Sequence, residues 1–225
     1  MISDQQILGI DDGHLVAVIQ GHKLQLPVKT AFLQMQLAAK KEGHDLQLVS
    51  SFRSFQKQAS IWQRKWQGEL PLNTVDGKIL DTNSLNDEQK MHAILLWSAL
   101  PGGSRHHWGT DFDVFDESKV KANAQQFKLV TSEYEADGPC ASLSQWLREN
   151  AEKFGFSLPY AKYIGGVAPE PWHLSFTPIA SEIVRRFSIN VLQQQLLRSN
   201  ISGLDMVISD LPEIFERYTL NRGIK

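Results

Sequence analysis

The chain has 225 residues, of which 42% are hydrophobic and 21% charged, a composition typical of a globular domain and unlike that of a disordered chain. Its 23 basic and 25 acidic residues give a net charge of −2, so it lacks the basic excess with which proteins neutralise nucleic-acid phosphates. The single cysteine, Cys140, excludes a disulfide framework within the chain, and no apolar run reaches the roughly 18 residues of a membrane span.

The organisation of the sequence is that of one domain over residues 1–225. No repeat, low-complexity tract or Pro/Gly/Ser-rich linker divides it. Residues 1–14 contain neither a basic start nor an apolar core of signal-peptide length. As written, the sequence therefore predicts a cytoplasmic protein, and prior removal of a leader would place it in the periplasm instead.

The first part of the chain alternates apolar runs with segments of helical spacing. Two apolar-rich runs flank Gly21-His22 and predict an opening hairpin. Residues 68–83 are rich in turn formers and predict a surface excursion. The predicted elements here are the hairpin over residues 14–28, a helix over 28–43, a strand over 45–52 and a helix over 54–67.

The second part begins with a helix within residues 86–103. Asp87 and Glu88 favour its N-terminus, and Pro101-Gly102-Gly103 is expected to end it. Polar and apolar residues then alternate in TDFDVFD, as they do in a half-buried strand. The predicted elements that follow are this strand over 110–116, a helix within 141–155 that stops at Gly155, a strand over 173–176, and helices from 178 to 221 with a break at Gly203.

This irregular interleaving of short strands and helices favours an α+β fold with an antiparallel sheet, flanked by helices, over a wound parallel sheet. A dinucleotide-binding fold is rejected because its Gly-rich strand-to-helix turn is missing. The polar motifs occupy residues 50–176. Residues from about 178 to 225 are expected to form an additional C-terminal helical segment.

Three segments hold nearly all the polar groups suited to chemistry, and each lies at a predicted strand edge or turn, where catalytic groups are commonly placed. The segments are residues 50–58, 104–116 and 169–176. A catalytic zinc ion takes three protein ligands and keeps a fourth position for water. The candidate ligands are His106 or His107, Asp111 or Asp113, and His173.

The two aspartates are unusual because aspartate is depleted in strands. Asp111 and Asp113 are two residues apart, so both point to one face of the predicted strand. A bound cation explains this pair, and a strand edge facing the surface is the alternative. Spacing alone leaves open which histidine and which aspartate bind the metal.

Together the three segments resemble the zinc D-alanyl-D-alanine carboxypeptidases and dipeptidases of the VanY and VanX type, in the superfamily of lysostaphin and hedgehog. That family has an S-x-H-x-x-G-x-x-x-D segment, a later E-x-W-H segment and an upstream serine–aromatic–arginine–serine segment. All three occur here in the family's order. They stand as Ser104, His106, Gly109 and Asp113; as Glu170, Trp172 and His173; and as Ser51, Phe52, Arg53 and Ser54, with Gln58 four residues further on.

The resemblance implies that His106, Asp113 and His173 are the zinc ligands, since His107 and Asp111 do not match ligand positions. Asp111 departs from the family pattern, in which a small or apolar residue is more usual. It is a candidate either to accept a hydrogen bond from a ligand histidine or to compete for the metal.

By the same resemblance, Glu170 is the general base, which takes a proton from the zinc-activated water and passes it to the leaving amine. Arg53 is expected beside the scissile carbonyl, where it stabilises the tetrahedral intermediate. Arg105 either pairs with a terminal carboxylate or lies on the surface. The residues expected to contact substrate are Ser104, Gln58 and Trp172, the last as a pocket wall.

The expected function is zinc-dependent hydrolysis of a D-amino-acid-containing peptidoglycan peptide, with D-alanyl-D-alanine carboxypeptidase activity favoured. The expected partner is a cell-wall peptide or precursor ending in D-Ala-D-Ala. One alternative is a murein endopeptidase of the same superfamily, which needs an open groove. The other is a non-catalytic zinc-stabilised binding module, against which Glu170 and Arg53 argue because a structural zinc requires neither a base nor an oxyanion partner.

Overall fold

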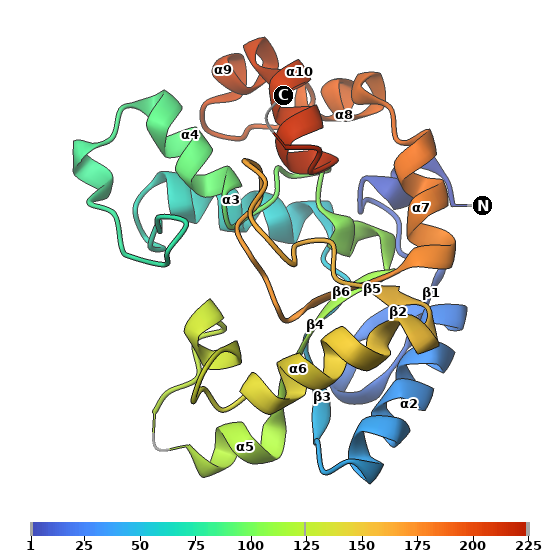
Figure 1. Ribbon diagram of the computed structural model, residues 1–225. Helices are drawn as coiled ribbons and strands as arrows, with labels where there is room; N and C mark the ends of the chain where they lie inside the picture. The colour runs from blue at the N-terminus through green and yellow to red at the C-terminus, as the bar shows by residue number, and fades with distance from the viewer. Residues whose placement is uncertain (1, 124, 224–225) are drawn as a thin grey trace.

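The computed structural model describes residues 2–123 and 125–223. It confirms the predicted α+β architecture, with a four-stranded antiparallel sheet in the order β3-β4-β6-β5 and a separate two-stranded sheet (Figure 1). The strands are β1 (Leu15–Ala17), β2 (Lys23–Gln25), β3 (Leu46–Ser50), β4 (Asp111–Asp116), β5 (Phe156–Ser157) and β6 (His173–Phe176).

Helices lie on both faces of the larger sheet. The α-helices are α1 (Asp4–Ile7), α2 (Leu26–Lys41), α3 (Phe55–Trp66), α4 (Asp87–Leu95), α5 (Glu117–Ala122), α6 (Ala141–Asn150), α7 (Thr177–Arg186), α8 (Ile189–Leu196), α9 (Leu204–Ser209) and α10 (Leu211–Ile214). The tighter or wider turns are η1 (Ile19–Gly21), η2 (Thr82–Ser84), η3 (Arg105–Trp108), η4 (Thr131–Tyr134), η5 (Ala151–Phe154) and the π-helical η6 (Phe215–Thr219). Within the described residues, no helix has both the length and the apolar character needed to cross a membrane.

The structure confirms the opening hairpin, the strands at β3, β4 and β6, and the longer predicted helices. The helix within residues 86–103 is shorter than predicted, because α4 ends at Leu95. After this point the backbone carbonyls bond to distant segments: that of Leu96 accepts from the N–H of Ala168, and that of Ala99 accepts from the Gln58 side chain. The elements that sequence analysis missed, such as α1, α5 and β5, are too short to show a periodic pattern.

One face of the sheet packs on α2 and α6 (Figure 1). Pro27 lies in the first turn of α2, where a proline fits because that N–H has no helical partner. Val28, Phe32 and Met35 follow at helical spacing and are buried. Phe32 meets Phe112 of β4 edge to face, with ring centroids 5.3 Å apart. Phe112 and Val114 of β4 therefore face this core, and Asp111 and Asp113 face the opposite side.

The prediction that β4 is half-buried is wrong, because only Phe115 of its six residues is partly exposed. The polar face of the strand is covered by a second layer that contains α3, α4 and the C-terminal helices α7 to α10 (Figure 1). Asp111 and Asp113 are consequently buried between layers and do not lie on a solvent-facing edge.

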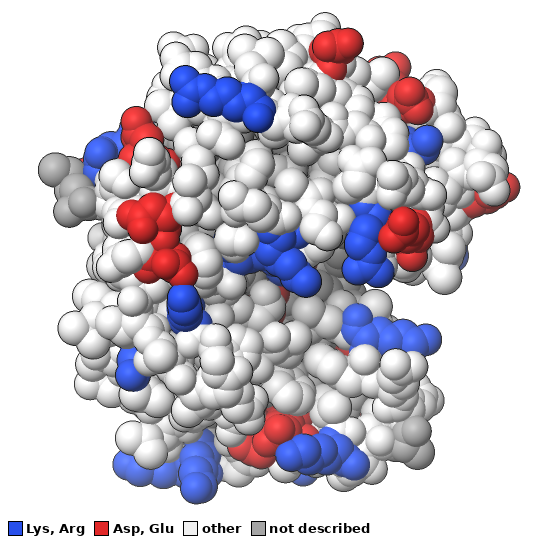
Figure 2. Space-filling model, turned by 180° about the vertical axis from the view of Figure 1, so that it is seen from behind, with Lys and Arg blue, Asp and Glu red and all other residues white. Residues whose placement is uncertain are grey.

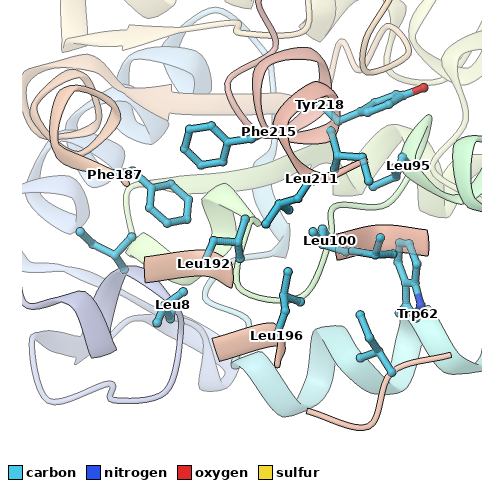
Figure 3. Close-up of a cluster of buried hydrophobic side chains, with 14 of the residues drawn as sticks. Leu8, Trp62, Leu95, Leu100, Phe187, Leu192, Leu196, Leu211, Phe215 and Tyr218 are labelled. Carbon is cyan, nitrogen blue, oxygen red and sulfur yellow. The ribbon is translucent and has the colours of Figure 1, made fainter. Parts of the chain in front are cut away.

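The C-terminal helices share an apolar core with the N-terminal half of the chain (Figure 3). Leu192 and Leu196 of α8 lie among Leu8, Trp62 of α3 and Leu100. Gly203 breaks the helical tail as predicted, with a φ of 73° just before α9. These helices cover the layer that holds the metal-binding segments.

Candidate metal centre and active-site cavity

Two neighbouring strands and one short turn bring three potential ligands together. The antiparallel register of β4 and β6 places Asp113 opposite His173, and the η3 turn delivers His106 to the same side. The Nε2 atom of His106 lies 3.4 Å from Oδ2 of Asp113, and Nδ1 of His173 lies 3.1 Å from Oδ1 of Asp113. The ligand atoms of the three buried side chains all lie within 4.8 Å of one another.

Each histidine of this cluster is oriented by a hydrogen bond from its other ring nitrogen. Nδ1 of His106 donates to the carbonyl of Ser51 at 2.9 Å, which leaves the Nε2 lone pair facing the cluster. Nε2 of His173 donates to the Asp111 carboxylate at 3.0 Å, which leaves Nδ1 facing Asp113. Such partners set the tautomer and ring orientation that a metal ligand needs.

The cluster fits a small divalent cation. Two ligands of a tetrahedral ion with bonds of about 2.0–2.1 Å lie roughly 3.3–3.4 Å apart, close to the separations found between Asp113 and each histidine. Burial lowers the pKa of His106 to about 4, so this ring is neutral as a ligand must be. Burial alone would also lower the pKa of His173, but hydrogen bonds to Asp111 and Asp113 raise it to about 9. Asp111 and Asp113 therefore stabilise a positive charge at this site.

Asp111 lies on the opposite edge of the His173 ring from Asp113 and outside the three-residue cluster. Its carboxylate also accepts hydrogen bonds from Arg105 Nε at 2.6 Å, Thr110 at 2.7 Å and Ser175 at 3.0 Å. Burial alone would raise the pKa of Asp111, but Arg105 and His173 hold it well below its usual range. Of the two roles expected for Asp111, the geometry matches the acceptor for a ligand histidine.

Arg105 is mostly buried, so the expectation that it lies on the surface is wrong, while its pairing with a terminal carboxylate stays a prediction. Its guanidinium donates to Asp111 and, through Nη2, to the hydroxyl of Ser175 at 2.6 Å. The same group lies over the ring of Trp108, 4.8 Å from the centroid. Arg105 neutralises the carboxylate behind the metal centre.

Glu170 lies beside the cluster, with Oε2 3.5 Å from Nδ1 of His173. Its segment is held by backbone bonds, since its N–H donates to the carbonyl of Tyr160 at 2.9 Å and its carbonyl accepts from the N–H of His173 at 3.1 Å. Burial raises the pKa of Glu170 to about 7, although the charge of His173 works in the opposite direction. A carboxylate with a pKa near neutrality is suited to accepting and returning a proton.

Arg53 reaches the same cavity from the start of α3. Its Nη1 donates to Oε1 of Gln58 at 2.8 Å and its Nη2 to the hydroxyl of Ser50 at 3.2 Å. Gln58 is fully buried, and its amide nitrogen donates to the carbonyl of Ala99 at 2.7 Å. The structure thus places Gln58 behind Arg53, where it orients the guanidinium and lies outside the cavity wall.

His107 braces the backbone that carries Arg53. Its Nδ1 donates to the carbonyl of Arg53, and its Nε2 accepts from the N–H of Gly102 at 3.0 Å. Burial lowers the pKa of His107 to about 3, so the ring is neutral. Gly9 lies against it at a φ of 75°, and a Cβ there would come within 2.4 Å of the ring. The adjacent histidines therefore have different positions, His106 in the cluster and His107 behind Arg53.

The cluster opens into a cavity of about 1050 Å³. Ser104 and Trp172 line it, and Trp172 stacks on Trp97 with ring centroids 6.3 Å apart. The turn-rich residues 68–83 contribute Asn73, Val75 and other side chains to one wall, so this surface excursion is also part of the site. Seen from behind, the surface is hollowed between the part that holds α4 and the part that holds α5, and basic side chains border the hollow (Figure 2).

Sequence analysis missed several side chains that reach the cavity. The Tyr160 ring lies 4.8 Å, centroid to centroid, from that of His173, and Tyr218 and Thr219 come from the C-terminal η6. None of these three belongs to a motif. Lys65 also lines the cavity. The sequence offered a pattern for this residue, because Lys65 follows Gln58 by seven residues on one helix and the two therefore share a face.

Residues 21–179 match the family model VanY, which is described as D-alanyl-D-alanine carboxypeptidase. An uncharacterised protein of Haemophilus influenzae strain Rd is 39% identical over 121 residues, which cover 53% of this chain and 92% of that protein.

Two solved structures resemble the fold. VanYB in complex with D-Alanine-D-Alanine has a TM-score of 0.56 at 21% identity, covering 77% of this chain and 83% of its own. A mutant of the vancomycin resistance D,D-pentapeptidase VanY in complex with Zn(II) has a TM-score of 0.54 at 22% identity, covering 76% and 84%.

Proposed function

The chain belongs to the VanY family of D-alanyl-D-alanine carboxypeptidases, and from this premise we propose that it removes the terminal D-alanine from peptidoglycan peptides ending in D-Ala-D-Ala. The family makes the protein a metallopeptidase-type enzyme that acts on peptidoglycan peptides, and not a non-catalytic binding module. The specific substrate, the metal and the role of each side chain are the parts that we propose.

Zinc is the proposed metal, held by His106, Asp113 and His173. Two nitrogen atoms and one oxygen atom from three protein side chains are the donor set of a catalytic zinc site, which keeps one position open. When bound there, zinc supplies Lewis acidity and lowers the pKa of water. A related VanY structure contains Zn(II), which also supports this choice.

The main support for hydrolysis is the position of Glu170, a buried carboxylate beside the metal centre with a pKa raised by burial to about 7. Glu170 takes a proton from the attacking water and returns it to the amine of the leaving D-alanine. Arg53, oriented by Gln58 and Ser50, donates hydrogen bonds to the oxyanion that forms at the scissile carbonyl. Trp172 and Ser104 bound the space in which the peptide lies.

Release of D-alanine from a peptide ending in D-Ala-D-Ala tests this function, with and without a chelator. We expect release by the zinc-loaded enzyme, loss of release with the chelator, and a fall in turnover of about 10²–10⁴-fold in Glu170→Ala. Metal analysis should find zinc still bound to Glu170→Ala, because Glu170 is outside the ligand set. Retained turnover in this variant would remove Glu170 as the base.

Murein endopeptidase activity is the second candidate function, and the size of the cavity supports it. At about 1050 Å³ the cavity exceeds the usual space for a small ligand, roughly 300–1,000 Å³. Digestion of intact cross-linked muropeptides is therefore compared with digestion of the free pentapeptide. Cleavage of cross-links without release of terminal D-alanine would replace the carboxypeptidase proposal with this one.

A further inference from the structure

Lys65 lies at the wall of the active-site cavity without a role in the chemistry described above. It is on α3, and Ile61, one turn earlier, lines the same cavity. Its side chain is half-buried. Gln58, two turns earlier on the same helix, holds Arg53. Two cationic groups thus reach a single cavity: Lys65 from the C-terminal part of α3, and Arg53 from just before its N-terminus, where Gln58 of the helix holds it.

The ammonium group of Lys65 has no hydrogen-bond or ion-pair partner among residues 2–123 and 125–223. Two other cationic side chains of the cavity are occupied, since Arg105 is paired with Asp111 and Arg53 donates to Gln58 and Ser50. Lys128 also lines the cavity but is exposed to solvent, whereas Lys65 is half-buried. Burial lowers the pKa of Lys65 to about 8, while the charge of Glu170 raises it and that of Arg53 lowers it. An unpaired, desolvated ammonium is costly unless an anion joins it.

The proximity of Glu170 indicates which anion would meet Lys65. Glu170 and Lys65 both line this cavity, and the charge of each shifts the pKa of the other. In the proposed reaction Glu170 returns a proton to the amine of the leaving residue. The carboxylate carbon of that residue is separated from its amine nitrogen by a single Cα, that is, by two bonds of about 1.5 Å each. A carboxylate at the end of the substrate therefore lies close to Glu170, in the cavity that Lys65 also lines.

We propose that Lys65 binds the C-terminal carboxylate of the peptide and so selects substrates with a free C-terminus. This inference rests on the proposed carboxypeptidase function and makes it more specific. The pairing is a charge-assisted hydrogen bond in a partly desolvated site. A peptide whose C-terminus is amidated, or continues into a cross-link, has no charge to offer Lys65. The same residue thereby disfavours endopeptidase action.

The test compares N-acetylated D-Ala-D-Ala peptides that end in a free acid or in an amide. Their binding to the zinc-loaded full chain is measured by calorimetry in a Glu170→Ala background, which prevents turnover. Lys65→Met removes the charge and keeps an unbranched apolar side chain. Lys57→Met is the matched control, because Lys57 is exposed on the same helix and outside the cavity wall. Lys65→Arg tests whether any cation at this position suffices.

We expect the acid to bind more tightly than the amide by about 10- to 100-fold, the range for a hydrogen bond to a charged group. Lys65→Met should lose this preference by weakening binding of the acid alone, whereas Lys57→Met should keep it. Lys65→Arg should retain part of it. An unchanged preference in Lys65→Met, or no preference with Lys65 intact, would overturn the proposal.

Turnover of the acid peptide by the chain with Glu170 intact is measured separately, so the two proposals can fail independently. Release of D-alanine without a preference for the acid in binding would reject the role of Lys65 and leave the carboxypeptidase function standing. Preference for the acid without release would reject the function and leave Lys65 as a carboxylate-binding residue.

Discussion

Asp111 connects the candidate metal centre to the charge balance of the buried layer. Its Oδ2 atom accepts hydrogen bonds from both the ring of His173 and the guanidinium of Arg105. The first bond orients a ligand, and the second neutralises a carboxylate that is completely buried. Because two donors depend on one side chain, a change at Asp111 alters both metal binding and folding stability.

Asp111→Asn should weaken zinc binding by about 10- to 100-fold, the usual effect of losing a hydrogen-bond partner behind a metal ligand. The amide oxygen of asparagine can still accept from His173 and Arg105, which both donate to Oδ2, but it carries no negative charge and is a weaker acceptor. The free energy of unfolding should fall by about 3–5 kcal/mol, since the buried charge of Arg105 loses its counter-ion. Competition with a chromophoric chelator measures the affinity, and urea denaturation of the metal-free protein measures the stability.

A second substitution separates these two effects. The double variant Arg105→Met/Asp111→Asn contains no unpaired buried guanidinium. It should therefore regain much of the free energy of unfolding that Asp111→Asn loses. Zinc affinity should stay low, because His173 still lacks its carboxylate acceptor. If zinc binds Asp111→Asn as tightly as the unchanged protein, Asp111 does not orient the ligand.

At the scale of elements, the C-terminal turn η6 and the residues after it hold the segment that leads to Glu170. Arg217 Nε donates to the carbonyl of Gly165 at 2.7 Å. Asn221 accepts from the N–H of Val167 at 3.1 Å and donates to the carbonyl of Pro159 at 3.4 Å. Residues outside the matched family region, 21–179, therefore position a loop of the site.

Asn221→Gly tests this positioning role. Asn221 has a φ of 48°, a left-handed conformation that glycine adopts without strain, so the variant removes the side-chain bonds and keeps the backbone. We expect kcat for D-alanine release to fall about 10- to 100-fold as Glu170 loses its placement, with zinc affinity unchanged. Steady-state kinetics and metal titration measure the two quantities.

The neighbouring residue supplies the control. Arg222 pairs with Glu216 at 2.8 Å on the surface, and Arg222→Ala should leave kcat unchanged because exposed ion pairs contribute little. A kcat in Asn221→Gly equal to that of Arg222→Ala would show that Glu170 is placed without help from the C-terminal residues.

For the whole molecule, the cluster in Figure 3 joins parts of the chain that are far apart in sequence. Leu8 comes from the N-terminal part of the chain, and Trp62 and Leu100 come from its middle. Leu192 and Leu211 come from the C-terminal helices. Gly102 lies against Leu192 so closely that a Cβ would come within 2.9 Å of its Cδ1. The C-terminal helices therefore belong to the core that supports the site, and we expect them to unfold together with the rest.

Leu192→Ala should lower the free energy of unfolding by about 2–5 kcal/mol, the cost of a cavity at a fully buried leucine. Leu197→Ala is the control: Leu197 is 59% exposed, and its loss should change stability by about 0.5 kcal/mol or less. Urea denaturation followed by circular dichroism and by tryptophan fluorescence should give one coincident transition. Two separate transitions would mean that the C-terminal helices fold as an independent unit.

The class of fold, most of the elements and the three segments that meet at the site can be predicted from the sequence alone. These features depend on local properties: alternation in β4, helical spacing in α2 and α3, and capping residues such as Ser54 and Asn86. The motif resemblance also separated His106 from His107, which spacing left open. The end of α4 was missed because distant partners, and no nearby residue, stop that helix.

The contacts that the side chains make could be found only in the folded structure. It put Asp111 and Asp113 at opposite edges of one histidine ring, paired Arg105 with a buried carboxylate, and placed Gln58 behind Arg53. It also brought Lys65 and Tyr218 to one cavity although they lie 153 positions apart in the sequence. Partners of this kind depend on how the layers pack, and the free energy of that packing is summed over the whole chain, so no local pattern records it.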